Sequence, residues 1–179
     1  MEITAPSGST SVASADMNGD GHLDLITRSA LDGGTGGNVI NVLLGDGGGG
    51  FSLAQTRRYR GSVTFGLAAA DFTGDGVPDL VDTGGSLFAG VGDGTISAPQ
   101  ALVIRDVMPP YGGIPLPVDV DRDGTMDLVL SGRQVVVAIG TGDGSFVATH
   151  RAPGTSTGLA VSRRSAALGD FNGDGHLDL

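Results

Sequence analysis

Cysteine and lysine are both absent from this chain of 179 residues, and aromatic side chains make up only 4% of it. Without cysteine, no disulfide can cross-link the fold. No apolar run reaches the roughly 18 residues that would indicate a membrane-spanning helix. The ten basic residues are all arginine and are outnumbered by 20 acidic ones, and this balance makes the chain a poor candidate for binding nucleic acid.

Glycine is abundant, with 33 residues, and 39% of the chain is hydrophobic. That hydrophobic content argues against general disorder. The apolar residues fall in many short runs that are cut by glycine and aspartate, a pattern typical of an all-β protein. Because no disulfide is available, bound metal is the candidate for stabilising such a fold, which suits an extracellular protein.

One acidic pattern, D-x-[NTD]-x-D-G-x-x-D-L, occurs four times. The copies begin at Asp16, Asp71, Asp119 and Asp170, with spacings of 55, 48 and 51 residues. Oxygen-bearing side chains stand at positions 1, 3, 5 and 9, and glycine stands at position 6, where the backbone turns sharply. Alternating oxygen ligands around a glycine turn are how a short loop wraps a hard cation such as Ca²⁺.

The net charge of −10 is concentrated in these loops, which hold 13 of the 20 acidic residues. Four bound Ca²⁺ ions would reduce the net charge to −2. Closely spaced carboxylates repel one another, and a cation relieves that repulsion. The acidity therefore indicates metal sites rather than a general acidic surface.

A second mark follows each of the first three loops: Gly-Asp-Gly at 45–47, 92–94 and 142–144, and then a hydrophobic residue. Such a turn joins the two strands of a hairpin. Four short strands per unit at a period near 50 residues predict the blades of a β-propeller. Pro115 and Pro117 predict an irregular or short first strand in unit three. The predicted strands span 11–15, 23–29, 38–44 and 51–58, then 64–70, 79–83, 86–90 and 98–105, then 114–118, 127–131, 134–140 and 146–151, and finally 160–169.

The four loops and three turns resemble the FG-GAP/VCBS repeat family, the Ca²⁺-loop propeller blades of integrin α-subunits and of many bacterial surface proteins. The resemblance implies an all-β chain with blades of four antiparallel strands. Three blades and part of a fourth fall short of the seven that are typical of the family, so we expect a partial or open propeller. The expected single repeat region spans 1–179, with blades near 11–60, 61–106, 107–155 and 156–179.

The resemblance also implies a ligand set for up to four Ca²⁺ ions. Position 7 would bind through its carbonyl oxygen and the other ligand positions through side chains. We expect ~10⁻⁴ to 10⁻³ M affinities, as in extracellular modules, with loop three tightest and loop two weakest. The implied ligands are Asp16, Asn18, Asp20, His22 and Asp24; Asp71, Thr73, Asp75, Val77 and Asp79; Asp119, Asp121, Asp123, Thr125 and Asp127; and Asp170, Asn172, Asp174, His176 and Asp178.

EF-hands and dockerins begin similarly but continue into a helix and place an acidic ligand at position 12. Here position 12 is Thr27, Asp82 and Leu130 in the first three copies, and the flanks are strand-like. A zinc site would need a histidine or cysteine cluster, and three scattered histidines do not form one in the sequence. No G-x-S-x-G motif or phosphate-binding loop is present, so no catalytic residue is predicted.

The family resemblance implies a non-catalytic extracellular or cell-surface module for adhesion or for recognition of a carbohydrate or protein. The alternatives are a non-catalytic propeller attached to a secreted enzyme, and an assembly unit that self-associates. The N-terminus shows no signal peptide, so we expect that the signal was removed or that the chain belongs to a longer one. The basic cluster 57–60 is expected on a solvated outer strand, with an anionic partner as the alternative, and 108–113 is expected to be a connector, with a ligand contact as the alternative.

Overall fold

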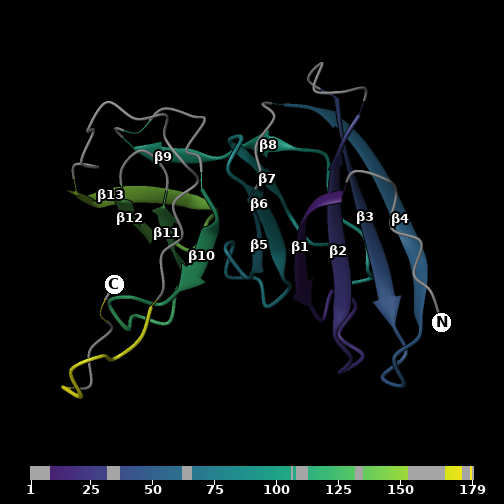
Figure 1. Ribbon diagram of the computed structural model, residues 1–179, viewed down its shortest axis with the longest axis horizontal. Coiled ribbons are helices and arrows are strands. Elements are labelled where there is room, and N and C mark those ends of the chain that lie inside the picture. Colours follow the sequence, from purple (N-terminus) through teal and green to yellow (C-terminus); the bar gives the residue numbers. More distant parts are fainter. Residues whose placement is uncertain are drawn as a thin grey trace.

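The computed structural model describes residues 9–31, 37–61, 66–105, 107, 113–131, 135–152, 168–174 and 178, and among these it contains strands and no helix. The all-β prediction is confirmed: three mainly antiparallel sheets stand side by side without closing into a barrel, as in a partial or open propeller (Figure 1). No helix in the described part of the chain is long and apolar enough to cross a membrane.

Each sheet is called a blade. Blade one is β1 (Ser9–Ala15), β2 (Asp24–Ala30), β3 (Gly37–Gly45) and β4 (Phe51–Arg60). Blade two is β5 (Leu67–Ala70), β6 (Asp79–Asp82), β7 (Ser86–Phe88) and β8 (Gln100–Ala101). Blade three is β10 (Pro115–Val118), β11 (Asp127–Ser131), β12 (Val135–Gly140) and β13 (Ser145–Ala152), joined by β9 (Val103–Arg105).

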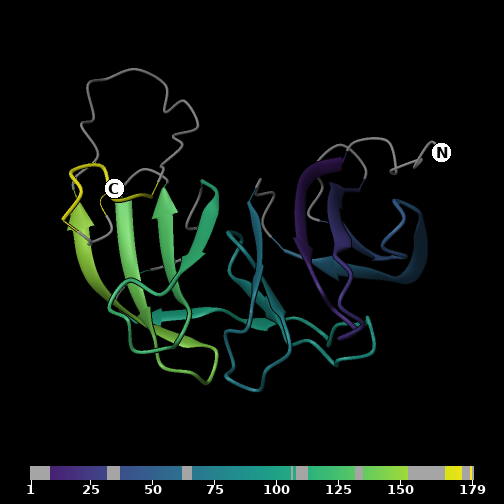
Figure 2. The ribbon, with the colours of Figure 1, turned by 90° about the horizontal axis from the view of Figure 1, so that it is seen from below.

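The first strand of each blade faces the first strand of its neighbour. β5 lies between β1 and β10, and the sheets spread from these inner strands like a fan (Figure 2). The inner strand of blade two carries Ala68, Ala69 and Ala70 after Leu67. Small side chains allow neighbouring sheets to approach closely, so this strand suits its place between β1 and β10.

The predicted single strand over 98–105 is wrong. The structure has two strands there: β8 pairs with β7, and β9 leaves blade two to pair in parallel with β13 of blade three. Leu102 and Ile104 are buried in the core between blades two and three. Burial of these two side chains explains the crossing, because it places the backbone beside β13.

The prolines of β10 do not make the strand irregular. β10 is short, as predicted, but Pro115 and Pro117 sit in continuous antiparallel register opposite Leu130 and Leu128. β10 is an edge strand of its sheet. Proline is tolerated on an edge strand because its missing N–H can face away from the neighbouring strand.

Two apolar cores lie between blades rather than within one blade. Ile26 and Phe88 are buried in the core between blades one and two. Phe72 and Phe146 are buried in the core between blades two and three, where their rings meet edge to face with centroids 5.8 Å apart. Full burial of such side chains contributes roughly 1.5–3 kcal/mol each, so the joints between blades stabilise the fold.

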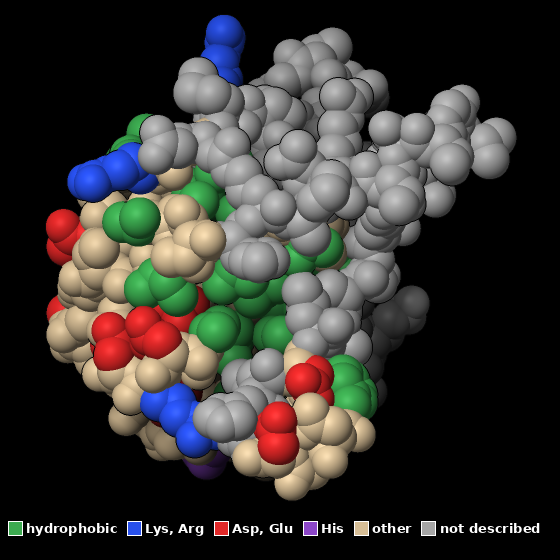
Figure 3. Space-filling view, turned by 90° about the vertical axis from the view of Figure 1, so that its left-hand side faces the viewer, with side chains coloured by type: hydrophobic (Ala, Val, Ile, Leu, Met, Phe, Trp, Pro, Cys, Tyr) green, Lys and Arg blue, Asp and Glu red, His purple; other side chains and the backbone are tan. Residues whose placement is uncertain are grey.

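The face of blade three that turns away from blade two is apolar as well. Buried and half-buried residues alternate along β12, and Val136 and Ala138 enter the core shared with blade two. Val137 and Ile139, of opposite alternation, therefore point to the other face. Figure 3 views the molecule from this side and shows hydrophobic side chains gathered at the centre of the face. Apolar residues on both faces are expected of a sheet that packs between two layers.

A buried polar network crosses the joint between blades one and two. The Arg28 side chain is fully buried; its Nε donates to Tyr59 Oη at 3.0 Å, and Nη2 donates to Asn38 Oδ1. The Tyr59 hydroxyl in turn donates to Asp82 Oδ2 of blade two at 2.6 Å. Burial and the neighbouring Asp82 carboxylate raise the pKa of Tyr59, so the phenol stays protonated and links the cation to the anion.

Replacing Tyr59 with phenylalanine is expected to destabilise the chain by about 1.5–3 kcal/mol, because a hydrogen bond to a buried charged group is lost on each side of the hydroxyl. Urea unfolding followed by circular dichroism measures this as a lower midpoint with an unchanged slope. An unfolding free energy that stays within about 0.5 kcal/mol of the native value, the range typical of surface changes, would contradict the structural role of the network.

Candidate metal centre

The four acidic patterns form loops, named here loop one (16–24), loop two (71–79), loop three (119–127) and loop four (170–178). Loops one, two and three connect the first and second strands of their blades: β1 to β2, β5 to β6, and β10 to β11. Each is followed by a strand and not by a helix, which confirms the exclusion of an EF-hand. The three loops therefore occupy equivalent places in three successive blades.

The first aspartate of each loop folds the loop around its own carboxylate. Asp16 accepts the N–H groups of Gly19 and Gly21 at 2.8 Å each. In the same way Asp71 accepts those of Gly74 at 2.7 Å and Gly76 at 2.8 Å. The glycines have positive φ, which favours residues without a Cβ. Loop three is the exception, because Arg122 takes the position 4 conformation with φ 66°.

The fifth position holds the second half of each loop. Asp20, Asp75 and Asp123 each accept the N–H of the residue two places on, at 2.7–2.9 Å. In loop one, Asn18 Nδ2 also donates to Asp20, and this bond is the main reason that the pKa of Asp20 is lowered. The carboxylates thus shape the loop before any cation is considered, and each oxygen keeps a further lone pair.

The ninth aspartate joins the loop to the rest of its blade. In loop two, Asp79 Oδ2 accepts the N–H groups of Phe72 and Thr73 at 2.9 Å each, while Oδ1 accepts the Gly90 N–H at 2.8 Å. Asp24 and Asp127 bind the equivalent groups of their own blades. All three side chains are fully buried. Position 9 therefore has a structural task that the sequence pattern did not reveal.

The glycine that donates to position 9 is required by a close approach. A Cβ on Gly45, Gly90 or Gly140 would collide with the carbonyl oxygen of the residue before the ninth aspartate. These three glycines are therefore equivalent in space. The predicted alignment of the Gly-Asp-Gly turn at 45–47 with those at 92–94 and 142–144 is wrong by two residues. Gly45 corresponds to Gly90 and Gly140. The constant distance of six residues from the glycine to Phe51, Ile96 or Phe146 is the sequence signal that gives the right register.

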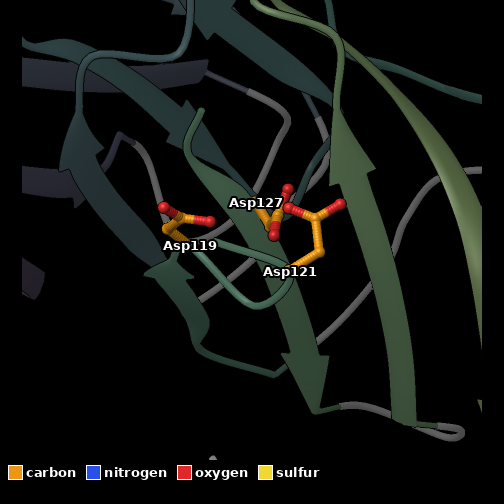
Figure 4. A group of neighbouring side chains, drawn as sticks. All are labelled: Asp119, Asp121 and Asp127. Carbon is orange, nitrogen blue, oxygen red and sulfur yellow. The ribbon is translucent and has the colours of Figure 1, made fainter. Parts of the chain in front are cut away.

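Loop three brings three carboxylates together. Asp119, Asp121 and Asp127 each offer an oxygen, and these oxygens lie within 4.8 Å of one another. Figure 4 shows the three side chains converging from the loop between β10 and β11. Asp123, also predicted as a ligand, lies outside this group of three. Carboxylates at this separation repel one another unless a cation or a proton lies between them.

Burial raises the pKa of Asp79 and of Asp127 above the ordinary carboxyl value, although each accepts backbone N–H groups that act in the opposite direction. Nearby Asp121 and Asp123 also raise the pKa of Asp127. A cation in the loop would have the opposite effect, because it favours the ionised form. A bound cation would therefore stabilise the ionised form of the aspartate at position 9.

Thr73, the position 3 residue of loop two, differs from its counterparts. Its Oγ1 atom is buried and makes no hydrogen bond of good geometry in the described part of the chain, although it lies close enough to the Asp79 carboxylate to lower the pKa of that group. A buried hydroxyl that is left without a good hydrogen bond costs roughly 1–3 kcal/mol. A poorly satisfied oxygen at the predicted ligand position is what a loop shaped for a cation would contain.

The remaining predicted ligands are placed as follows. His22, Val77 and Thr125 donate their N–H groups to position 5 carboxylates, and their carbonyl role stays a prediction. The His22 ring is exposed and lies against Gly47. In the described part of loop four, Asp170, Asn172, Asp174 and Asp178 make the same bonds as their counterparts in loop one, and 175–177, with His176, lie outside the described residues.

The turns after the third strands carry a second set of carboxylates. Asp143 accepts from the side chains of Ser145 and Thr141, which lowers its pKa to about 2. Asp93 is held by Thr95 in the same way, and the pKa of Asp46 is lowered by the N–H groups of Gly50 and Gly48. Their oxygens are thus used within the turn, so these aspartates act as turn caps.

Of the other segments noted in the sequence, the basic cluster lies on the outer strand β4, with Arg58 and Arg60 exposed and Tyr59 buried. Arg57 is half-buried and donates to the Ile96 carbonyl of blade two. The segment 108–112 lies outside the described residues.

Comparison with known families agrees with this geometry. Residues 119–179 match the model of FG-GAP-like repeats, and residues 8–42 match the model of the FG-GAP repeat. Together the two matches cover more than half of the chain and include loops one, three and four. No curated protein matches the chain. With its repeated loops in equivalent places of successive four-stranded blades, the chain belongs to the FG-GAP repeat family, whose repeats are integrin-like propeller repeats and are generally non-catalytic.

Proposed function

We propose that this chain is a calcium-binding, non-catalytic β-propeller module that works outside the cell or on its surface, in adhesion or in recognition of a protein or glycan. The observation that carries the proposal is the convergence of Asp119, Asp121 and Asp127 in loop three. Loops one, two and four repeat the same folding of the chain around a first aspartate. The proposed blades remain those expected from the sequence, within one repeat region.

The donor set suits calcium. The side chains at positions 1, 3, 5 and 9 offer carboxylate, amide and hydroxyl oxygens, which hard cations prefer and softer metals do not. In loop two, the buried Oγ1 of Thr73, which makes no hydrogen bond of good geometry in the described part of the chain, stands at a ligand position. Residues at positions 1, 3, 5, 7 and 9 would hold the ion. When bound, Ca²⁺ would neutralise the carboxylates and tie the two ends of the loop together.

Calcium titration by isothermal calorimetry tests the metal part of the proposal. We expect saturable binding of up to four ions with dissociation constants of ~10⁻⁴ to 10⁻³ M. A matched control replaces the four position 5 aspartates with alanine, since all four side chains are exposed and those of loops one to three accept an N–H group of their own loop. The residues changed are Asp20, Asp75, Asp123 and Asp174. Equal heats from the native chain and from this variant would contradict the proposal.

The recognition part is tested with the chain immobilised on a sensor and exposed to panels of glycans and extracellular proteins. We expect retention of at least one ligand in calcium and its loss in EGTA, because the ions fix the loops that position the blades. The variant with all four position 5 aspartates replaced by alanine, here called the four-site variant, serves as the control for effects of EGTA on the ligand. Binding that is equally strong in EGTA would contradict a calcium-dependent module.

Calcium affinity is expected to fall as the pH is lowered from about 7 to about 5. Burial raises the pKa of Asp79 and Asp127, so protons compete for these carboxylates at a higher pH than for an ordinary aspartate. Affinity falls at lower pH because the ionised carboxylate is the ligand. Below the raised pKa, calcium must displace a proton in order to bind. Calorimetry at the two pH values, repeated in buffers of different ionisation enthalpy, measures the proton release. Affinity that is unchanged or higher at the lower pH would contradict the assignment of position 9 as a ligand.

A further inference from the structure

The second residue of a loop is also part of the joint to the next blade. In loop one, Met17 donates its N–H to Asp24 at 2.8 Å and buries its whole side chain in the core shared with blade two. Its carbonyl accepts the N–H of Gly94, in the turn of blade two, at 3.1 Å. One residue between two predicted ligands, Asp16 and Asn18, thus holds the neighbouring blade.

The same arrangement recurs at the next joint. Phe72 donates to Asp79 at 2.9 Å, is 1% exposed, and packs edge to face against Phe146 of blade three. Its carbonyl accepts the Gly144 N–H at 3.0 Å. A Cβ on Gly74 of the same loop would lie only 3.0 Å from the Gly142 carbonyl oxygen, so loop two and the turn of blade three are in close contact.

Each of these turns leads back to a loop. The turn that touches Met17 through Gly94 begins at Gly90, whose N–H donates to Asp79 of loop two. The turn that touches Phe72 through Gly144 begins at Gly140, whose N–H donates to Asp127 of loop three. A continuous path of hydrogen bonds and short turns therefore runs from the first loop to the second and from the second to the third.

We infer that the cation sites of successive blades are coupled, so that filling one loop raises the affinity of its neighbours; this inference rests on the proposed calcium function. The coupling element is the joint, which acts through the bonds from Gly94 to the Met17 carbonyl and from Gly144 to the Phe72 carbonyl. Repulsion among the carboxylates of an empty loop weakens the hold of that loop on its position 2 carbonyl, so the bond to the next turn opens more often. A filled loop fixes that carbonyl, the turn docks, and the ninth aspartate of the next loop is held in its binding position. Coupling of this kind is reciprocal by linkage.

The experiment uses the full chain and empties one site from outside the joint. Asp75→Ala removes an exposed carboxylate of loop two that contacts neither turn of a neighbouring blade in the described bonds. Calcium calorimetry is expected to show one site fewer and, in addition, about fivefold or greater weakening of the remaining binding, which is the lower end of typical coupling between sites. If Asp75→Ala loses one site and the remaining sites keep their native affinities, the coupling is overturned and the proposed calcium function stays intact. Absence of calcium binding in the native chain would instead overturn the proposed function.

A matched pair of variants tests the joint. Phe72→Ala removes a buried position 2 side chain, whereas Phe171→Ala removes the same side chain at the same position of loop four, where it is 70% exposed. We expect Phe72→Ala to abolish the effect of Asp75→Ala on loop three, which is reached through the Phe72 joint, and Phe171→Ala to preserve it. Equal coupling in both variants would overturn the role of the joint.

Hydrogen exchange keeps the inference testable if Phe72→Ala fails to fold. In the native chain, calcium is expected to slow exchange of the Gly144 amide, which bonds to the Phe72 carbonyl. In Asp75→Ala, a surface change, this slowing is expected to be lost while loop three still binds calcium. Full calcium protection of the Gly144 amide in Asp75→Ala would overturn the inference.

Discussion

Chelation of calcium by EGTA is expected to lower the melting temperature of this chain by roughly 10–20 °C. A ligand that binds only the folded state stabilises it by about 2.7 kcal/mol when its concentration is one hundred times its dissociation constant. For a chain of this size, 1 kcal/mol corresponds to roughly 2–4 °C. Two or more occupied loops therefore account for the expected shift.

Differential scanning calorimetry in about 10–100 mM calcium, one hundred times the expected dissociation constants, and in EGTA measures this shift. Restoring calcium is expected to restore the melting temperature, and magnesium is expected to do so less well, because it demands a stricter geometry and gives up its water reluctantly. The four-site variant is expected to melt at the same temperature in both buffers. Coincident melting curves of the native chain in calcium and EGTA would exclude stabilising metal sites.

Replacing Asp79 with alanine is expected to destabilise the chain by about 3–5 kcal/mol even in EGTA. The Asp79 carboxylate is fully buried and accepts three N–H groups, those of Phe72, Thr73 and Gly90. Loss of hydrogen bonds to a charged group costs about 1.5–3 kcal/mol each, and donors left buried without a partner add to the cost. Water that enters the space left by the side chain can bond to these N–H groups, so the total destabilisation is smaller than the sum of the three separate costs.

Asp75→Ala is the matched control, because it changes the same residue type in the same loop at an exposed position. In EGTA we expect its urea midpoint to lie close to that of the native chain, while both variants lose calcium binding in loop two. Asp79→Asn retains one acceptor oxygen, so its urea midpoint is expected to lie between those of Asp75→Ala and Asp79→Ala. Equal destabilisation by the position 5 and position 9 variants would show that Asp79 acts only as a cation ligand.

The sequence was sufficient to predict the four loops, most strands and the propeller type of fold, because these depend on local patterns that recur. Position 6 needs glycine for its positive φ, as at Gly21, Gly76 and Gly124, and the sequence has glycine there in all four copies. The strands that follow each loop begin at the ninth aspartate, at Asp24, Asp79 and Asp127. Local chemistry and period together were enough for this level of description.

The joints could not be predicted, because their partners are far apart in the sequence. Arg28 can be fully buried because Tyr59 and Asn38 accept from it on other strands, and Tyr59 in turn donates to Asp82 of blade two. Its charge alone would place it on the surface. The crossing of β9 depends on the core between blades two and three, which exists only once both blades are folded. The double role of position 9 was hidden for the same reason, since Gly45 lies 21 residues from Asp24.

The parallel pair of β9 and β13 gives the molecule a direction in which it resists tension. Val103, Ile104 and Arg105 lie beside Ser145, Phe146 and Val147 in the same orientation. A pull on the chain before β9 and after β13 drags the two strands past each other, so their hydrogen bonds are loaded in shear and must fail together. The antiparallel hairpins peel apart one pair at a time under the same load. The parallel pair therefore holds blades two and three together under tension along the chain.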